Sequence, residues 1–486
     1  MNTRISVIGT GYLGATHAAC LAELGFEVLG VDNDRAKVAR LSQGSAPFSE
    51  PGVDALLERH VRTGRLRFTT DLREAAGFAD VHFICVGTPQ ARSGLAADLG
   101  SLLAVARGLA EHVTRDCLII GKSTVPVGTA ERLAADVADL VRPGVRAEIA
   151  WNPEFLREGH GVQDTMSPDR LVFGVSSLEA ELVLRRIYAQ QIAAGIRVHV
   201  TDVATAELAK VAANSFLATK ISFINAMAEV SDRSGADVVA LADILGDDSR
   251  IGRRFLDAGI GFGGGCLPKD IRAFSARATE LGAHAVAGLL QEVDDINLHA
   301  RQRTVDLARE LCGPTVRGRR IAVLGAAFKP HSDDVRDSPA LHVAGQLHLQ
   351  GAEVRVYDPE ASNNARAVFP ALTYVASVEA ALLDADLVLH LTDWPEFLAL
   401  DPHRAATLVR CRRIIDGRNR LDDRRWRAAG WTLRGIGRGA RGSDLRETVA
   451  ALDPTPDLTP DRTMGAARPL PPHQLAGRPG TMLERT

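Results

Sequence analysis

Short apolar runs alternate with amphipathic stretches along the first 200 residues of the chain. The runs include "SVIG", "EVLGV", "VHFIC", "CLIIG" and "EIAW", and each leads into a turn with glycine, proline or polar residues. The stretches between them, such as residues 101–112 and 130–141, have the periodicity of helices. Strands that alternate with helices predict a parallel sheet with right-handed crossovers. We therefore expect an N-terminal α/β domain over residues 1–201.

The pattern changes after residue 201. Residues 203–235 contain no helix breaker for about 30 positions, which predicts one long helix. Helical segments at 268–281 and 286–311 extend this into a mostly helical middle domain over residues 202–312. The run "RRIAVLG" then restarts the alternation, which predicts a second α/β domain over residues 313–440. Residues 441–486 are proline-rich and aperiodic, and we expect a disordered tail there.

Composition narrows the class of protein. The chain has 24% charged and 46% hydrophobic residues and a net charge of -3, which is typical of soluble globular proteins. This balance gives no reason to expect nucleic-acid or membrane binding. The sequence contains no run of about 18 apolar residues, so we do not expect a membrane-spanning helix. Glycines interrupt the apolar start of the chain, so we do not expect a signal peptide.

The cysteines indicate a reduced compartment. They are widely scattered without a C-x-x-C pair, which argues against a disulfide framework and against a zinc site. We therefore expect a cytoplasmic protein without a metal site. Five of them lie among apolar residues and are expected to be small buried hydrophobes, whereas Cys266 has glycine, proline and charged neighbours. The six are Cys20, Cys85, Cys117, Cys266, Cys312 and Cys411.

A nucleotide fingerprint opens the chain. The segment "GTGYLG" supplies Gly9, Gly11 and Gly14 between a predicted strand and a predicted helix. These glycines permit a tight turn and let a pyrophosphate approach the helix N-terminus. Asp32 ends the next strand, 23 residues after Gly9, where its carboxylate would bind a ribose 2′-hydroxyl and repel a 2′-phosphate. This predicts NAD rather than NADP; an ordinary strand-turn-helix with incidental glycines is the alternative.

Cys266 lies in the glycine-rich segment "GIGFGGGCLPKD". It precedes a predicted helix with Pro268 in its first turn. The helix dipole and the charge of Lys269 predict a thiol pKa below the usual value of about 8.5, and hence a nucleophile. The surrounding glycines would let a substrate come close. The alternative is a flexible loop with an incidental cysteine.

Two further groups of polar residues are candidates. Glu207, Lys210, Asn214 and Asn225 fall near one face of the long predicted helix, although a solvated stripe would also explain them. Glu154 and Glu158, in "NPEFLREGHG", are spaced for one side of a helical turn. Such a pair suits acid/base chemistry, and capping or salt bridging equally.

Three cations, Lys329, Arg336 and Arg418, follow predicted strands, where open α/β sheets bind ligands. Anionic nucleotide groups would explain all three, as would surface salt bridges.

Taken in order, the motifs "GTGYLG", "KSTVPVGT", "NPEFLREG", the Lys210/Asn214 helix, "GFGGGCLPKD" and "FKPHSDDVRDSPAL" resemble those of the UDP-glucose/GDP-mannose dehydrogenase family. The likeness covers about residues 5–437. It implies two Rossmann-like doubly wound parallel-sheet domains, the first binding NAD and the second a UDP-sugar. It also implies a helical middle domain that carries a homodimer contact. The family oxidises a nucleotide-sugar alcohol to the acid by two hydride transfers to two successive NAD molecules.

The resemblance also implies roles for individual residues. Cys266 would be the nucleophile that forms a thiohemiacetal and then a thioester. Lys210 would stabilise the oxyanions, with Asn214 in the same catalytic set. Asp270 with Thr124 and a water would handle the alcohol proton, and Glu154 would activate water on the thioester. The positions implied at NAD are Gly9, Gly11, Tyr12, Leu13, Gly14, Asp32, Lys37, Thr88, Thr124, Glu158, Lys269 and Arg336. Those implied at the nucleotide-sugar are Glu154, Phe155, Leu156, Lys210, Asn214, Arg250, Phe255, Gly263, Phe328, Lys329 and Arg418.

Two longer segments resemble the branch of the family that uses UDP-glucose. These are "NPEFLREG" followed by "MSPDRLVFG", and the loop "DDSRIGRRFLDAGIGFGGGC". They predict oxidation of UDP-glucose to UDP-glucuronate, with a UDP-N-acetylhexosamine or GDP-mannose as the alternative substrate. Gly161 and Gly265 stand where many relatives carry a side chain, which predicts a wider pocket. The competing classes, a one-step hydroxyacid dehydrogenase and a non-catalytic nucleotide-binding protein, need no cysteine at this place.

Overall fold

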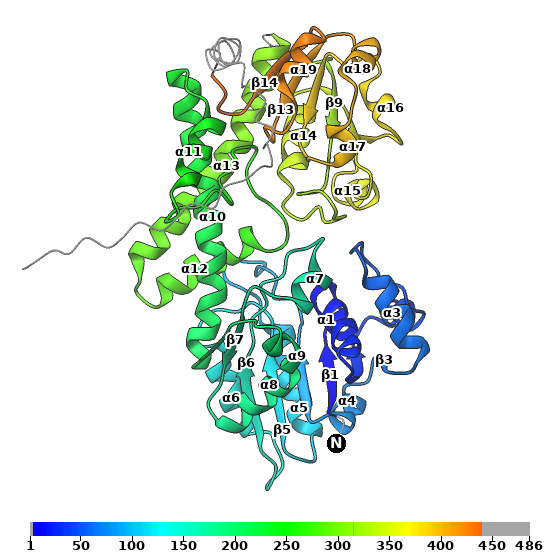
Figure 1. The fold of residues 1–486 in the computed structure, drawn as a ribbon, viewed down its shortest axis with the longest axis vertical. Helices are drawn as coiled ribbons and strands as arrows, with labels where there is room; N and C mark the ends of the chain where they lie inside the picture. The colour runs from blue at the N-terminus through cyan, green and yellow to red at the C-terminus, as the bar shows by residue number, and fades with distance from the viewer. Residues whose placement is uncertain (1–2, 314, 440–486) are drawn as a thin grey trace, which may run out of the picture. The chain divides into compact units, whose positions relative to one another are not determined.

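An eight-stranded sheet organises the first part of the chain in the computed structural model, which describes residues 3–313 and 315–439 (Figure 1). The strand order is β3-β2-β1-β4-β5-β6-β7-β8, and all neighbours are parallel except β6 and β7, which are antiparallel. The parallel sheet predicted from the sequence is therefore confirmed, with one antiparallel pair that the sequence did not indicate. The strands are β1 (Arg4–Ile8), β2 (Glu27–Val31), β3 (Leu66–Thr69), β4 (Val81–Ile84), β5 (Cys117–Gly121), β6 (Ala147–Trp151), β7 (Leu171–Gly174) and β8 (Val198–Thr201).

Helices cover both faces of this sheet, and two separate clusters of buried apolar side chains fill the space between helices and strands. The strand order reverses at β1 and β4, so the loops after these two strands border the crevice where such sheets bind ligands. The helices are α1 (Tyr12–Glu23), α2 (Arg35–Ser42), α3 (Val53–Arg62), α4 (Leu72–Phe78), α5 (Gly100–His112), α6 (Thr129–Ala138), α7 (Gly161–Met166), α8 (Leu178–Ile187) and α9 (Ala189–Ala193).

Four helices form the middle of the chain. They are α10 (Val203–Ser234), α11 (Val238–Asp247), α12 (Leu267–Glu280) and α13 (His284–Cys312). The three helices predicted from the sequence match α10, α12 and α13 to within two residues at each end. Helices α10, α12 and α13 pack against one another around a small apolar cluster. The segment that carries Cys266 connects α11 to α12.

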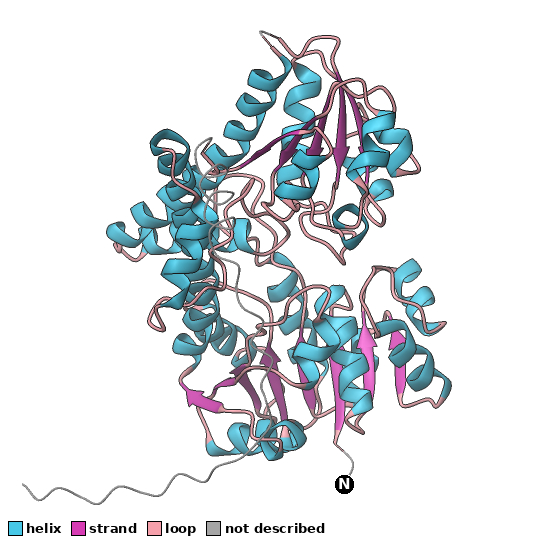
Figure 2. Ribbon diagram, turned by 45° about the horizontal axis from the view of Figure 1, so that its top comes forward, coloured by secondary structure: helices cyan, strands magenta, loops and turns pink. Residues whose placement is uncertain are grey.

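A second, six-stranded parallel sheet follows (Figure 2). Its order, β11-β10-β9-β12-β13-β14, repeats the reversal of the first sheet at β9 and β12. The predicted fold class is thus confirmed, while residues 441–486 lie outside the described residues. The strands are β9 (Arg320–Leu324), β10 (Glu353–Tyr357), β11 (Thr373–Tyr374), β12 (Leu387–His390), β13 (Arg413–Asp416) and β14 (Thr432–Gly435). The helices are α14 (Pro339–Leu349), α15 (Ser362–Val368), α16 (Val378–Leu382), α17 (Pro395–Leu398), α18 (Pro402–Leu408) and α19 (Asp423–Ala428).

The second sheet repeats one polar detail of the first. Asp32 follows β2 and accepts a hydrogen bond from the backbone N–H of Thr10, in the loop after β1. Asp358 follows β10 and accepts from the backbone N–H groups of Ala326 and Ala327, in the loop after β9. The indole of Trp394 also donates to Asp358, at 3.1 Å.

Over the described ranges, no helix is both long enough and apolar enough to span a bilayer.

Candidate active site

The loop after β1 has the geometry of a phosphate-binding turn. Gly9 has φ +89° and Gly14 packs so closely on the carbonyl of Gly9 that a β-carbon would collide with it. A β-carbon on Gly11 would meet no atom within 4 Å, so the space beside it is open. Gly11 is the N-cap of α1 and provides no side-chain cap, and the first turn has no acidic residue. The helix N-terminus therefore offers free N–H groups to an anion, as the pyrophosphate of NAD requires.

Asp32 is fixed beside this turn. Its carboxylate accepts from the N–H of Thr10 at 2.9 Å and pairs with Lys37 at 2.8 Å. Burial alone would raise the pKa of Asp32, but the hydrogen bonds from Lys37 and the backbone outweigh it and hold the pKa below its usual range. Asp32 is thus an anion placed where a ribose would lie. Leu13 packs on the core beneath, and the hydroxyl of Tyr12 donates to Glu50.

Lys210 and Glu154 form an ion pair with a distance of 2.9 Å between Nζ and Oε1. The other carboxylate oxygen of Glu154 accepts from the N–H of Leu156 at 2.7 Å, which fixes the "NPEF" turn. Burial works against the charge of Lys210, but Glu154, Cys266 and Asp270 more than compensate and raise its pKa. Lys210 is therefore a buried cation at neutral pH. The ring of Phe155 lies 5.5 Å from its ammonium group.

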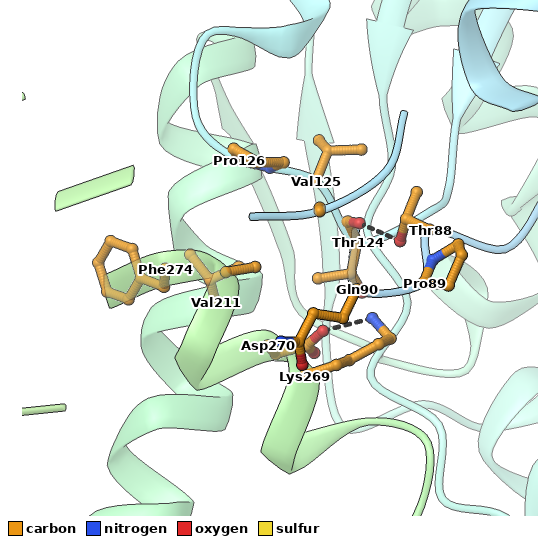
Figure 3. A pocket seen from close by; sticks show the side chains of 12 residues that line it. Thr88, Pro89, Gln90, Thr124, Val125, Pro126, Val211, Lys269, Asp270 and Phe274 are labelled. Atoms are coloured by element: carbon orange, nitrogen blue, oxygen red, sulfur yellow. Dashed lines mark hydrogen bonds and ion pairs between the residues drawn. The ribbon is translucent and has the colours of Figure 1, made fainter. Parts of the chain in front are cut away.

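Asp270 lies in the first turn of α12, where Asn214 and Lys269 hold it. Asn214 donates to one carboxylate oxygen at 2.7 Å, and Lys269 pairs with the other. Figure 3 shows Lys269 and Asp270 facing Thr88 and Thr124 across a pocket. The hydroxyl of Thr88 donates to the carbonyl of Thr124 at 2.7 Å and so joins the loops after β4 and β5. The pocket thus collects four of the residues expected at the cofactor and the alcohol proton.

Cys266 is the N-cap of α12, as its sequence context predicted, but the expected low pKa is wrong. The residue is open to solvent on one side, while protein atoms surround its thiol densely at longer range. That burial, together with the carboxylates of Glu154 and Asp270, raises the thiol pKa to about 12; Lys210 opposes the shift without cancelling it. The helix dipole, Lys269 and Asp270 were visible in the sequence, whereas the burial of the thiol and the carboxylate of Glu154 come from the fold.

Glu158 contacts residues of the second sheet domain. The ammonium of Lys329 donates to the carbonyl of Glu158 at 2.6 Å, and Arg336 pairs with its carboxylate at 3.3 Å and with Asp334 at 2.6 Å. Burial and the charge of Asp334 raise the pKa of Glu158 to about 7, against the opposing effect of the two cations. Glu158 therefore takes up a proton near neutral pH, unlike an ordinary glutamate.

Of the remaining residues expected at the nucleotide-sugar, some lie at the cysteine loop and others do not. Arg418 donates to the carbonyls of Leu391, Gly261 and Phe328 and so contacts the cysteine loop and the loop after β9. Gly263 lies against the carbonyl of Asp337, where a β-carbon would collide. Among the described contacts, none links Arg250 or Phe255 to this group. Arg250 is exposed and pairs with Asp248, and Phe255 has φ +66°.

The expectation of a wider pocket at Gly161 and Gly265 is wrong. A β-carbon on Gly265 would collide with the guanidinium of Arg336, which occupies that space. A β-carbon on Gly161 would lie 3.1 Å from the hydroxyl of Tyr12, and its N–H already donates to Glu50 at 2.7 Å. Both glycines make room for protein side chains rather than for a ligand.

Two buried polar residues near the site were missed from the sequence. Glu50 accepts from the N–H groups of Gly159 and Gly161 and ties the turn after Glu158 to α1 through Tyr12. Lys122, in "KSTVPVGT", donates to the side chain of Asn152 at 2.9 Å, and burial lowers its pKa to about 8. The polar residues of "KSTVPVGT" were a usable signal for Lys122, whereas "FSEPG" around Glu50 resembles an ordinary turn.

The predicted polar face of α10 is buried rather than solvated. Glu207 accepts from the N–H groups of Gly128 and Ala130 at the start of α6, at 2.7 and 2.6 Å. Asn225 accepts from the N–H of Gly259 at 2.9 Å. This helix therefore contacts the "KSTVPVGT" segment, the catalytic candidates and the cysteine loop with successive side chains of one face.

Comparison with known proteins agrees with this geometry. Models of the UDP-glucose/GDP-mannose dehydrogenase family match three parts of the chain: the NAD binding domain at residues 3–192, the central domain at 204–299 and the UDP binding domain at 322–423. The UDP-glucose 6-dehydrogenase TuaD of Bacillus subtilis (strain 168) is 41% identical over 460 residues, which cover 94% of this chain and 98% of that protein. The chain belongs to the UDP-glucose/GDP-mannose dehydrogenase family.

Two solved structures of the family superpose on most of this chain. A UDP-glucose dehydrogenase from Pyrobaculum islandicum superposes with a TM-score of 0.83 at 38% identity, covering 90% of this chain and 98% of that one. A UDP-D-ManNAc dehydrogenase from Pyrococcus horikoshii superposes with a TM-score of 0.79 at 30% identity, covering 90% and 99%. As a member of this family the chain is an NAD-dependent oxidoreductase, and the open N-terminus of α1 with Asp32 beside it fits that cofactor.

Proposed function

We propose that this protein oxidises UDP-glucose to UDP-glucuronate by way of a covalent intermediate on Cys266. The observation that carries the proposal is a cluster of charged groups at the thiol: Lys210 pairs with Glu154 at 2.9 Å, and the N–H of Asp270 donates to the carbonyl of Cys266 at 3.0 Å. A one-step hydroxyacid dehydrogenase needs no thiol at this place. The relatives at about 40% identity over most of the chain are UDP-glucose 6-dehydrogenases.

The chemistry divides between the cofactor and the side chains. NAD, when bound, accepts one hydride in each of two successive oxidations. For the first, Asp270 takes the proton of the C6 hydroxyl through Thr124 and a water, and the product is an aldehyde. Lys210 lies where its charge stabilises oxygen anions formed at C6, because it is buried and fully protonated.

Cys266 then captures the aldehyde. Its sulfur forms a bond to C6 as the C=O π bond breaks, and the thiol proton passes to the carbonyl oxygen, which becomes the hydroxyl of a thiohemiacetal. Loss of a second hydride and of the hydroxyl proton converts the thiohemiacetal to a thioester. Water, deprotonated by Glu154, adds to the thioester carbon, the C–S bond breaks, and the proton held by Glu154 passes to the sulfur, so that the acid is released and the free thiol is regenerated. Because the resting pKa of the thiol is about 12, we expect the proton to leave as the bond to carbon forms rather than beforehand.

UDP-glucose is the proposed sugar nucleotide for two reasons. The side chains of Arg336, Tyr12 and Glu50 fill the spaces beside Gly265 and Gly161, which removes the argument for room to hold an acetamido group. A site built for an equatorial 2-hydroxyl also leaves buried partners unpaired with other sugars, at about 1–3 kcal/mol each. The alternative, a UDP-N-acetylhexosamine, is motivated by the likeness to the Pyrococcus horikoshii UDP-D-ManNAc dehydrogenase.

A panel of substrates tests this proposal. We expect kcat/KM for UDP-glucose to exceed the values for UDP-N-acetylglucosamine, UDP-N-acetylmannosamine and GDP-mannose by roughly tenfold or more. Two NADH should form per UDP-glucose consumed, and NADP should be a poor acceptor because Asp32 repels its 2′-phosphate. A better rate with another sugar would contradict the substrate, one NADH per sugar would contradict the mechanism, and equal efficiency with NADP would contradict the role of Asp32.

We infer that two copies of the chain associate through the middle helices. Leu208, Phe216, Phe223 and Val230 are exposed on α10 at offsets of 8, 7 and 7 residues, which places them along one side of the helix. Ile244 on α11 is also exposed. An exposed apolar strip of this length is typical of an interface, and the buried polar face of the same helix is turned to the active site. The proposed partner is a second copy of this chain.

Replacing both Phe216 and Phe223 by arginine is expected to convert the dimer to a monomer. The exposed aromatic side chains would contribute much of the buried apolar area, and four arginines facing one another across a two-fold axis repel. Light scattering after size-exclusion chromatography measures the mass. Leu182→Arg, an exposed apolar site on α8, is the matched control and should stay dimeric. A wild-type protein that is monomeric at micromolar concentration would rule out the interface.

We also place the protein in the cytoplasm. All six cysteines, which lie within the described part of the chain, are free, as expected in a reducing compartment.

A further inference from the structure

The loop that carries Cys266 is held by side chains that have no part in the chemistry. Asn297 of α13 accepts from the N–H of Phe262 at 2.7 Å and donates to the carbonyl of the same residue at 3.1 Å. Its amide thus pairs with both backbone groups of one residue, as a neighbouring strand would. Asn297 is fully buried. The fit is close, because a β-carbon on Gly261, which has φ +92°, would collide with the Asn297 side chain.

Arg301, one helical turn further along α13, strengthens this contact. Its guanidinium donates to the carbonyl of Phe262 at 2.9 Å and to the carboxylate of Asp337 at 2.7 Å. Arg301 is only 1% exposed, so the ion pair is a costly feature to bury and its geometry is fixed. Asp337 also accepts from Arg272 of α12, at 3.3 Å, and thereby links α13 to the helix that begins at the end of the loop.

The same network reaches the loop after β9. Asp337 follows Arg336, whose carbonyl accepts from the N–H of Gly264 at 2.9 Å. Gly263 and Gly264 lie against the carbonyl of Asp337 and the ring of Phe328, with no space for a β-carbon at either. The backbone is therefore held at residues 262 and 264, within four residues of the nucleophile.

We propose that Asn297 and Arg301 are positioning residues for Cys266, and that they determine how much of the aldehyde intermediate the thiol captures. The proposal rests on the proposed function. The first oxidation needs the alcohol, NAD, Asp270 and Lys210, but not the thiol. Capture of the aldehyde needs the sulfur within bonding reach of C6, and displacement of a reacting atom by about 1 Å can lower such a rate by about a hundredfold. A loosened loop therefore slows capture and leaves the first oxidation in place.

The test measures which product the enzyme releases, aldehyde or acid, as well as the rate of the reaction. Asn297→Leu keeps the side-chain size and removes both hydrogen bonds to Phe262. Arg301→Lys keeps a charge for Asp337 but loses the fork that serves two acceptors, and it continues the test if the leucine variant does not fold. Each purified full-length variant is incubated with UDP-glucose, NAD and hydroxylamine. The trapped aldehyde, as its oxime, and the acid are quantified by mass spectrometry alongside NADH.

We expect both variants to release at least about tenfold more of the product as aldehyde than the wild type, with NADH per sugar falling from two toward one. Ser222→Ala is the matched control: its hydroxyl donates to the carbonyl of Val293 at 2.7 Å, a buried hydrogen bond between α10 and α13 that uses no backbone group of the loop. That variant should keep the wild-type ratio of aldehyde to acid. Slower variants that still yield two NADH and no oxime would overturn the proposal. A wild type that makes no acid would instead refute the proposed function itself.

Discussion

Replacing Cys266 by alanine is expected to lower the yield of UDP-glucuronate by about a thousandfold or more. Without the thiol neither the thiohemiacetal nor the thioester can form, and removal of a covalent nucleophile has effects of this size or larger. The first oxidation does not need the thiol, so a low rate of aldehyde formation can survive. Acid and NADH are measured over many turnovers by chromatography and absorbance.

Cys117→Ala provides the comparison for this variant. Cys117 is another free thiol whose pKa burial raises to about 12, but it lies at the start of β5 and contributes nothing to the chemistry. It should retain near wild-type activity. Formation of UDP-glucuronate by Cys266→Ala at the wild-type level would contradict the assignment of Cys266 as the nucleophile.

Replacing Lys210 by methionine is expected to lower kcat roughly 100- to 1,000-fold for both oxidations. The side chain keeps its length but loses the buried charge that pairs with Glu154 at 2.9 Å and acts on Cys266 and Asp270. Loss of one preorganised donor to a developing oxyanion has effects of this order. Single-turnover kinetics with UDP-glucose, and separately with the aldehyde as substrate, resolve the two steps.

Arg233→Met is a matched control on the same helix. Arg233 is exposed and pairs with Glu229, far along α10 from the reacting groups, so its loss should leave kcat unchanged. If Lys210→Met slowed only the oxidation of the aldehyde, the residue would serve the thiohemiacetal alone and its proposed role in the first step would be wrong.

The sequence predicted the elements well where the signal was local. Helix α10 was expected from an unbroken stretch and α12 from a proline after a capping position, and both signals depend on neighbours in the chain. The polar face of α10 was identified from spacing alone. Which backbone groups Glu207 and Asn225 would contact was not, because their partners lie 79 and 34 residues away along the chain.

Electrostatics was the part that the sequence could not supply. The pKa of Cys266 was expected to fall, because Lys269 and the helix start are adjacent to it in the sequence. It rises because surrounding protein atoms crowd the thiol and because Glu154, from a distant turn, and Asp270 add negative charge beside it. The space at Gly265 was misjudged for the same reason, since only the fold reveals that Arg336 fills it.

The indole that caps Asp358 gives the two halves of the chain different ligand capacities. Both sheets present an acid after their second strand, but Asp358 accepts four backbone N–H groups and the indole of Trp394, and it is 2% exposed. A ribose would find no free oxygen there. Although the architecture is duplicated, the second acid therefore braces its own domain, whereas Asp32 lies beside the open glycine turn. Removal of Trp394 alone would not free this carboxylate, because its four backbone donors would remain.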